Sequence, residues 1–185
     1  MTIVFQLRAS AGAAADASSS SIGMGSTPRE QVEGLYHVAA RSNAEEHIFC
    51  DERDYISGIT ILGELVGAGV LECHEFCFMP THYHLLASFE DGGISTALQR
   101  LNRRYAGGFN RRHGRRGRVF DSPYASVLVE DDRHLLWLAR YIANNPSRRP
   151  WPYSSHDSYF SFVDPAPLIE AFGSEQRWRE FASHS

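Results

Sequence analysis

Residues 70–89 read VLECHEFCFMPTHYHLLASF, which is two apolar runs with a short break between them. The first run, 70–79, has the length and composition of a buried strand. Pro80 and Thr81 interrupt this run, and residues 82–89 then have the composition of a second strand. Because strands joined by so short a break run in opposite directions, this stretch predicts an antiparallel strand pair.

Strand-like and helical patterns alternate along the rest of the chain. The expected elements are a strand at 35–42, a helix at 52–67 capped by Asp51, a helix at 94–112, a strand at 125–129 and a helix from Asp131 to about Asn144. Together with the central pair, the order is β-α-β-β-α-β-α. This order predicts an α+β fold of the ferredoxin-like split βαβ type, with a four-stranded antiparallel sheet, helices on one face and an additional C-terminal helix.

Composition divides the chain into residues 1–33, 34–160 and 161–185. The first part contains an Ala-, Ser- and Gly-rich stretch, 9–24, which cannot bury enough apolar surface to order itself and is expected to be disordered. It lacks the features of a secretory signal, and Met24 is an alternative start of translation. The second part is the expected folded domain. The third is a tail, and the aromatic and proline-rich sequence after Trp151 is expected to pack across the sheet or helices.

All 18 basic residues of the chain are arginine. The lack of lysine excludes several mechanisms, namely a Walker A phosphate site, a Schiff base and a Ser–Lys dyad, so no nucleotide cofactor is expected. Codon usage in a GC-rich genome would explain the missing lysine without any function.

The arginines are unevenly distributed along the chain. Residues 92–120 contain eight arginines and no Asp or Glu, although the whole chain has a net charge of −4. A local basic segment of this kind favours nucleic-acid binding, whereas a solvated helix face is the alternative interpretation.

The sequence contains no run near the roughly 18 apolar residues that a membrane span needs, so we expect a cytoplasmic protein without a membrane partner. Its three cysteines, Cys50, Cys73 and Cys77, are too few for a secreted disulfide framework. Four residues of a strand separate Cys73 from Cys77 by roughly 13 Å, too far to share one metal ion. We interpret all three as buried or incidental thiols.

His82 and His84 flank Tyr83 in the second predicted strand. Because alternate side chains of a strand project from the same face, these two imidazoles can converge on one divalent ion. Two ordinary histidines at a strand end are the alternative interpretation.

The last predicted helix ends in LLWLARYIANNP, residues 135–146. Leu138 and Ile142 share a face of this helix and are expected to pack inward. Tyr141 and Asn145 are four residues apart and therefore also neighbours. Taken singly, the simplest interpretations are a packing tyrosine with a solvated hydroxyl and an asparagine at a helix C-terminus.

Several of these segments occur together in a recognisable order. They are GLYHVAARSN (34–43), IFCDERDY (48–55), MPTHYHLL (79–86), LQRLNRRYAGGFNRRHGRRGRVF (98–120), RYIANNPSR (140–148) and WPYSS (151–155). In this combination the chain resembles the REP-associated tyrosine transposases, a group of single-tyrosine transposases within the HUH (His-hydrophobic-His) nucleases. The resemblance extends from about residue 28 to about residue 160.

The resemblance implies specific roles for four residues. In the family two histidines hold Mg²⁺ or Mn²⁺, and His82 and His84 match them, while Asn145 matches the polar residue that completes the metal site. Tyr141 matches the nucleophile, whose attack would give a 5′-phosphotyrosine. Members of the family cleave and rejoin single-stranded or hairpin DNA, as monomers or homodimers.

The resemblance also suggests that the basic segment is a track for DNA beside the metal site. Guanidinium groups bind phosphates in a bidentate manner and stack on unpaired bases. The candidate DNA-binding residues are Arg100, Arg103, Arg104, Arg111, Arg112, Arg115, Arg116 and Arg118. Tyr105 and Phe109 lie between them but fit the apolar face of the helix, which predicts that they belong to the core.

The chain departs from the family pattern at three places. Thr81 replaces the usual asparagine before the first histidine, and Ser122 and Pro123 replace a common glycine–arginine pair. After Pro146 the residues at 147–149 are Ser-Arg-Arg, where the family commonly has valine, arginine and alanine. Two other functions stay open at this point: a domesticated DNA-binding protein that recognises REP-type repeats without cleaving them, and a metal-dependent hydrolase built on the histidine pair.

Overall fold

The computed structural model describes residues 32–42, 46–90, 92–121 and 124–183. The predictions about disorder near the N-terminus and about a start at Met24 lie outside these residues, as do the departures at Ser122 and Pro123.

The centre of the molecule is a four-stranded antiparallel sheet. Its strands are β1 (Gly34–Arg41), β2 (Glu72–Met79), β3 (His82–Phe89) and β4 (Ala125–Leu128), in the spatial order β2-β3-β1-β4. The pair predicted from residues 70–89 is the β2–β3 hairpin. This strand order is that of a split βαβ sheet, which confirms the predicted α+β fold.

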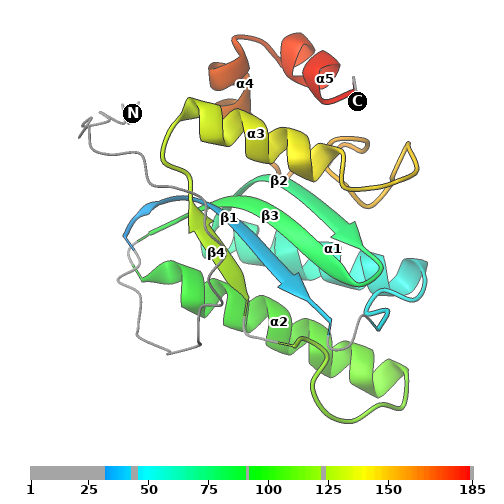
Figure 1. The fold of residues 1–185 in the computed structure, drawn as a ribbon. Coiled ribbons are helices and arrows are strands. Elements are labelled where there is room, and N and C mark those ends of the chain that lie inside the picture. Colours follow the sequence, from blue (N-terminus) through cyan, green and yellow to red (C-terminus); the bar gives the residue numbers. More distant parts are fainter. Residues whose placement is uncertain (1–31, 43–45, 91, 122–123, 184–185) are drawn as a thin grey trace, which may run out of the picture.

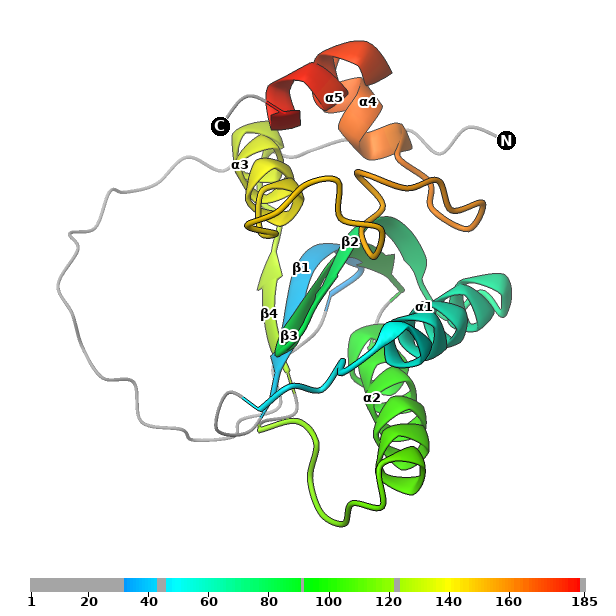
Figure 2. The same cartoon turned by 90° about the vertical axis from the view of Figure 1, so that its right-hand side faces the viewer.

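One face of the sheet is covered by α1 (Glu52–Gly67) and α2 (Gly93–Arg112), as Figures 1 and 2 show. Tyr83 and Leu85 of β3 point to this face and share a core with Tyr105 and Phe109 of α2, which confirms the assignment of both aromatic residues to the core. This larger core forms because alternate residues of each central strand project to the same side.

The opposite face of the sheet carries α3 (Asp132–Ala143), α4 (Ala166–Phe172) and α5 (Glu175–Ser183) (Figure 2). Leu86 of β3 packs there against Ile142 of α3, and Leu168 and Trp178 of the last two helices complete this second core. Leu138 and Ile142 are both buried, as the helical spacing predicts. The chain that follows residue 160 therefore forms two helices that pack on α3.

Aspartate residues cap the N-termini of two helices, as predicted. Asp51 accepts hydrogen bonds from the backbone N–H groups of Arg53 and Asp54, and Asp131 accepts one from the backbone N–H of His134. These bonds satisfy donors that have no partner within the first turn of a helix.

The segment that follows α3 runs along the outer edge of β2. The backbone N–H of Phe78 donates to the carbonyl of Tyr153 at 3.0 Å, and that of Asp164 donates to the carbonyl of Cys73 at 2.8 Å. These bonds cover an edge that would otherwise expose unpaired backbone groups. No helix within the described part of the chain is long and apolar enough to cross a membrane.

Candidate active site

The two histidines of the His-x-His pair lie at the start of β3. In the β1–β3 ladder Arg41 pairs with His82 and Ala39 pairs with His84. Tyr83, between them, points to the other face of the sheet, where it is buried and its hydroxyl donates to Oδ1 of Asn102 at 2.6 Å. The pleat of the strand therefore turns both imidazoles toward the face that carries α3.

Asn145 bridges the two imidazoles. It follows α3 directly, and its amide Oδ1 lies 3.0 Å from Nε2 of His82 while its Nδ2 lies 3.3 Å from Nε2 of His84. Helix α3 ends at Ala143, so Asn145 lies just beyond the last turn, at the end of the helix that faces β3. Two ring nitrogens and one amide, 61 and 63 residues apart in sequence, thus converge at one point.

The other nitrogen of each imidazole also has a partner. Nδ1 of His82 lies 3.0 Å from the hydroxyl oxygen of Thr81, and Nδ1 of His84 lies 3.0 Å from Nε2 of His37. His37 was not singled out from the sequence, because it is an isolated histidine on β1. Only the strand register, with Ala39 opposite His84, shows that the two histidines share a face. Partners of this kind orient the imidazoles that bind metals.

Burial keeps these imidazoles neutral. It lowers the pKa of His84 to about 3, and His37, His82 and Arg41 act in the same direction. Burial also lowers the pKa of His82, although the hydrogen bond to Asn145 opposes the shift, and it lowers the pKa of His37 to about 4. A neutral imidazole is the form that offers a lone pair to a metal ion.

Tyr141 lies against the imidazoles from the last turn of α3. Its ring is 5.1 Å from the ring of His84, at 79°, and 6.1 Å from that of His37. It is 42% exposed, so the packing against histidine leaves the ring accessible. Tyr141 and Asn145 also line one open cavity of about 360 Å³, together with Trp137, Arg140 and Asn144.

The family model for IS200-like transposases matches residues 31–145, which include β1, both histidines, Tyr141 and Asn145. The chain belongs to this family. A search of curated proteins found no match.

Two solved structures resemble this IS200-like transposase. A REP-associated tyrosine transposase bound to a REP hairpin is 13% identical, with 76% of this chain and 98% of that chain covered and a TM-score of 0.58. A protein of Deinococcus radiodurans R1, described as a candidate transposase, is 17% identical, with 68% and 100% covered and a TM-score of 0.45. The first of these shows that the fold is that of a REP-associated tyrosine transposase.

The transposase has a donor set that suits a divalent cation. Nε2 of His82, Nε2 of His84 and the amide oxygen of Asn145 are all neutral ligands of types that bind such ions. Since the two Nδ1 atoms are held by Thr81 and His37, the ε-nitrogens are oriented toward the common point. The residues present therefore fit a metal site of the kind expected from the sequence.

A second cluster of side chains that could bind a metal ion lies between the start of α1 and the end of α2. Atoms of Cys50, Asp54 and His113 lie within 4.8 Å of one another. The buried carboxylate of Asp54, however, already accepts hydrogen bonds from the backbone N–H of Cys50 and from the guanidinium of Arg112, and it contacts Nε2 of His113. This cluster therefore joins the start of α1 to the end of α2. Cys73 and Cys77 are buried in different cores, and all three cysteines are free thiols.

Most of the arginines that were expected beside the predicted metal site lie on another part of the molecule. Helix α2 carries five of them on the face of the sheet opposite to α3 and Tyr141 (Figure 1). The sequence could not show this, because helical periodicity does not tell which face of the sheet a helix covers. Only the end of the segment approaches the histidines: Phe120 bridges to Ser42, next to Arg41 and its partner His82.

The eight arginines also differ in their partners. Three form ion pairs with acidic residues on or before α1: Arg104 with Glu64, Arg112 with Asp51 and Asp54, and Arg115 with Glu46. The other five have no ion pair within the described residues: Arg100, Arg103, Arg111, Arg116 and Arg118. These five are exposed, so their charge is available to a partner.

Proposed function

We propose that this IS200-like transposase cleaves and rejoins single-stranded or hairpin DNA, with Tyr141 as the nucleophile and a divalent ion, Mg²⁺ or Mn²⁺, held by His82, His84 and Asn145. The observation that carries the proposal is the convergence of both histidine ε-nitrogens on the Asn145 amide, with the Tyr141 ring packed against His84. Resemblance to the family supports the same four assignments.

The proposed reaction exchanges one phosphate ester for another. The phenolic oxygen of Tyr141 attacks phosphorus, the bond from phosphorus to the 3′-oxygen breaks, and the downstream strand stays on the protein through its 5′-phosphate as a 5′-phosphotyrosine. The phenol loses a proton and the departing 3′-oxygen gains one. Attack by a 3′-hydroxyl on the phosphotyrosine reverses these changes and rejoins a strand without an external energy source.

The residues around Tyr141 supply the conditions for this exchange. A divalent ion withdraws charge from the non-bridging oxygens of a phosphate and orients it for attack. Three neutral ligands would leave such an ion its full charge, because none of them is an anion. Packing between Tyr141 and His84 keeps the phenol next to the metal ligands, and its exposure leaves room for a DNA strand.

We also propose that the five exposed, unpaired arginines bind DNA outside the cleaved nucleotides. A solved structure with this fold is bound to a REP hairpin, and those of these exposed cations that belong to α2 lie on the face of the sheet opposite to Tyr141. Because Tyr141, His82, His84 and Asn145 all belong to one chain, cleavage in this proposal needs no second copy.

The test is formation of a covalent adduct. A single-stranded hairpin oligonucleotide, labelled at either end, is incubated with the protein and Mn²⁺ and analysed under denaturing conditions. We expect an adduct that carries the label of the 3′ end, because the strand downstream of the break is attached through its 5′-phosphate. Tyr141→Phe should abolish the adduct and retain binding, whereas Tyr159→Phe, at a tyrosine that is 88% exposed, should leave it unchanged. Binding by the unaltered protein without any cleavage would instead favour the non-cleaving alternative.

A further inference from the structure

Helix α3 carries an exposed tryptophan that does not pack into either core. Trp137 is 62% exposed and belongs to neither core, whereas Leu135, Leu138, Ala139 and Ile142 of the same helix are buried. Tryptophan contributes more binding energy than most side chains when it is covered, so a tryptophan left open beside a site indicates a surface that a ligand covers.

The position of Trp137 relative to the proposed nucleophile is specific. It lies one helical turn before Tyr141, and the two rings are parallel, with 6° between their planes and 5.7 Å between their centres. Asn145 follows Tyr141 by four residues, just beyond the end of α3, so the indole, the phenol and the amide of the proposed metal site succeed one another along this part of the chain. All three residues line the same open cavity.

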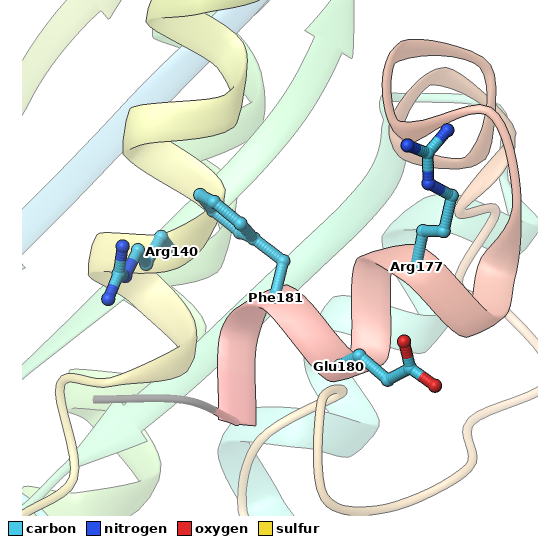
Figure 3. Close-up of a pocket in the computed structure, with 4 residues that line it drawn as sticks. All are labelled: Arg140, Arg177, Glu180 and Phe181. Carbon is cyan, nitrogen blue, oxygen red and sulfur yellow. The ribbon is translucent and has the colours of Figure 1, made fainter.

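A positive charge lies beside this row. Arg140 lines the cavity with Trp137 and Tyr141, and it also lines a neighbouring cavity of about 430 Å³ between α3 and α5. Figure 3 shows the ring of Phe181 pointing from α5 toward α3, and the guanidinium of Arg140 lies 5.0 Å from the centre of that ring. The cavity that Trp137 and Tyr141 line therefore also includes a cation, which suits the phosphate attached to a stacked base.

We propose that Trp137 is a stacking platform for one unpaired nucleobase next to the nucleotide that Tyr141 cleaves, with Arg140 contacting the adjoining phosphate. The flat face of an indole accepts any base, and the parallel alignment with Tyr141 brings the stacked base into line with the reacting group. The occupant is a single-stranded nucleic acid because an aromatic plane and a cation in one cavity match a base and its phosphate. This inference rests on the proposed function and assigns a role in substrate positioning to a residue outside the metal site.

The test measures binding rather than cleavage. Labelled single-stranded oligonucleotides are titrated with the full chain in the Tyr141→Phe background, using a complete strand and a set in which each carries one abasic position. We expect Trp137→Ala to weaken binding of the complete strand about tenfold or more, and Trp137→Phe to recover most of it. At one abasic position the effect of Trp137→Ala should disappear, because the base that it stacks on is missing.

Two controls separate stacking from folding. Tyr159→Ala removes another exposed aromatic ring and should not change binding. Since Trp178 is buried and Trp151 is only partly exposed, quenching of tryptophan fluorescence by DNA should come mainly from Trp137 and should be lost in Trp137→Phe. A merely structural role of Trp137 would not produce this selective loss.

The outcomes distinguish this inference from the proposed function. Equal binding of every oligonucleotide by the Trp137→Ala variant and its parent would overturn the stacking platform, even if the unaltered protein forms the covalent adduct. Self-association that Trp137→Ala abolishes, without an effect on DNA, would also overturn it by assigning the surface to a second copy. A third outcome is that the effect of Trp137→Ala on binding disappears at one abasic position while the unaltered protein forms no adduct. This outcome would support Trp137 as the stacking platform and contradict the assignment of Tyr141 as the nucleophile.

Discussion

Nε2 of His37 lies 3.0 Å from Nδ1 of His84, and their rings are stacked at 20° with 5.1 Å between centres, although 47 residues separate them in the sequence. This contact holds the ring of His84 from the side opposite to Asn145. We expect His37→Ala to weaken Mn²⁺ binding about 10- to 100-fold, because the imidazole of His84 loses the partner that orients it. Calorimetric titration with Mn²⁺ measures the effect, with His47→Ala, at an exposed histidine, as the control. Unchanged affinity would show that His37 does not position His84.

Asn145 offers a second test of the same site. Its amide contacts the ε-nitrogens of both His82 and His84. We expect Asn145→Ala to weaken Mn²⁺ binding at least about tenfold, because one of the three proposed ligands is lost. Asn145→Asp restores an oxygen ligand and adds a negative charge, so it should bind Mn²⁺ at least as well as the unaltered protein. Normal binding of the ion by Asn145→Ala would show that Asn145 is not one of its ligands.

His156 predicts a pH dependence of stability. Its ring packs against Trp178, and burial, together with the charge of Arg149, lowers its pKa to about 4. The unfolded chain binds a proton at this histidine below about pH 6.5, whereas the folded protein does not until about pH 4. Its contribution to stability is therefore complete above pH 6.5 and is lost as the pH falls toward 4.

The measurement is the thermal midpoint at a series of pH values between 7 and 4. We expect His156→Phe to show a smaller fall in this midpoint than the unaltered protein, because the buried group no longer takes up a proton on unfolding. The other buried histidines remain in both proteins, so the difference isolates His156. Parallel curves would contradict the prediction.

The exposed and the paired arginines should respond differently to substitution. We expect Arg116→Ala and Arg118→Ala each to weaken DNA binding and to reduce the slope of log affinity against log salt by about one, as for a lost phosphate contact. Arg112→Ala should instead lower the thermal midpoint, because Asp54 is buried and loses its guanidinium partner. Titrations of DNA at several salt concentrations measure the affinity and its salt dependence for each variant. Normal binding by both exposed-arginine variants would remove these two residues from the proposed DNA surface.

The last two helices should be part of the cooperative fold. Trp178 is 5% exposed, and its ring contacts Phe172 of α4 and His156. We expect Trp178→Ala to cost about 3–5 kcal/mol of unfolding free energy, as is usual for a buried aromatic side chain. Denaturant unfolding measures the loss, and Trp137→Ala, at an exposed tryptophan, should cost far less. A small effect of Trp178→Ala would mean that α5 is only loosely attached.

Much of the fold was predictable because it depends on local patterns. The apolar runs around Pro80, the helical spacing after Asp51 and Asp131, and the alternation at Tyr83 follow from periods of 2 and 3.6 residues. These periods determine which residues form strands and helices and which side chains share a face. The same alternation brought His82 and His84 to one side, and the helical spacing put Tyr141 near Asn145.

Relationships between distant segments were decided only by the tertiary structure. The contact of His37 with His84 depends on the register of two strands, and the separation of most arginines from Tyr141 depends on which face of the sheet α2 covers. The packing of Trp178 and the exposure of Trp137 depend on how α4 and α5 fold back onto α3. The sequence by itself therefore determined the helices and strands and the residues that can bind a metal or react. Long-range packing decided which of these residues meet, because periodicity carries no information about partners that are far apart in the chain.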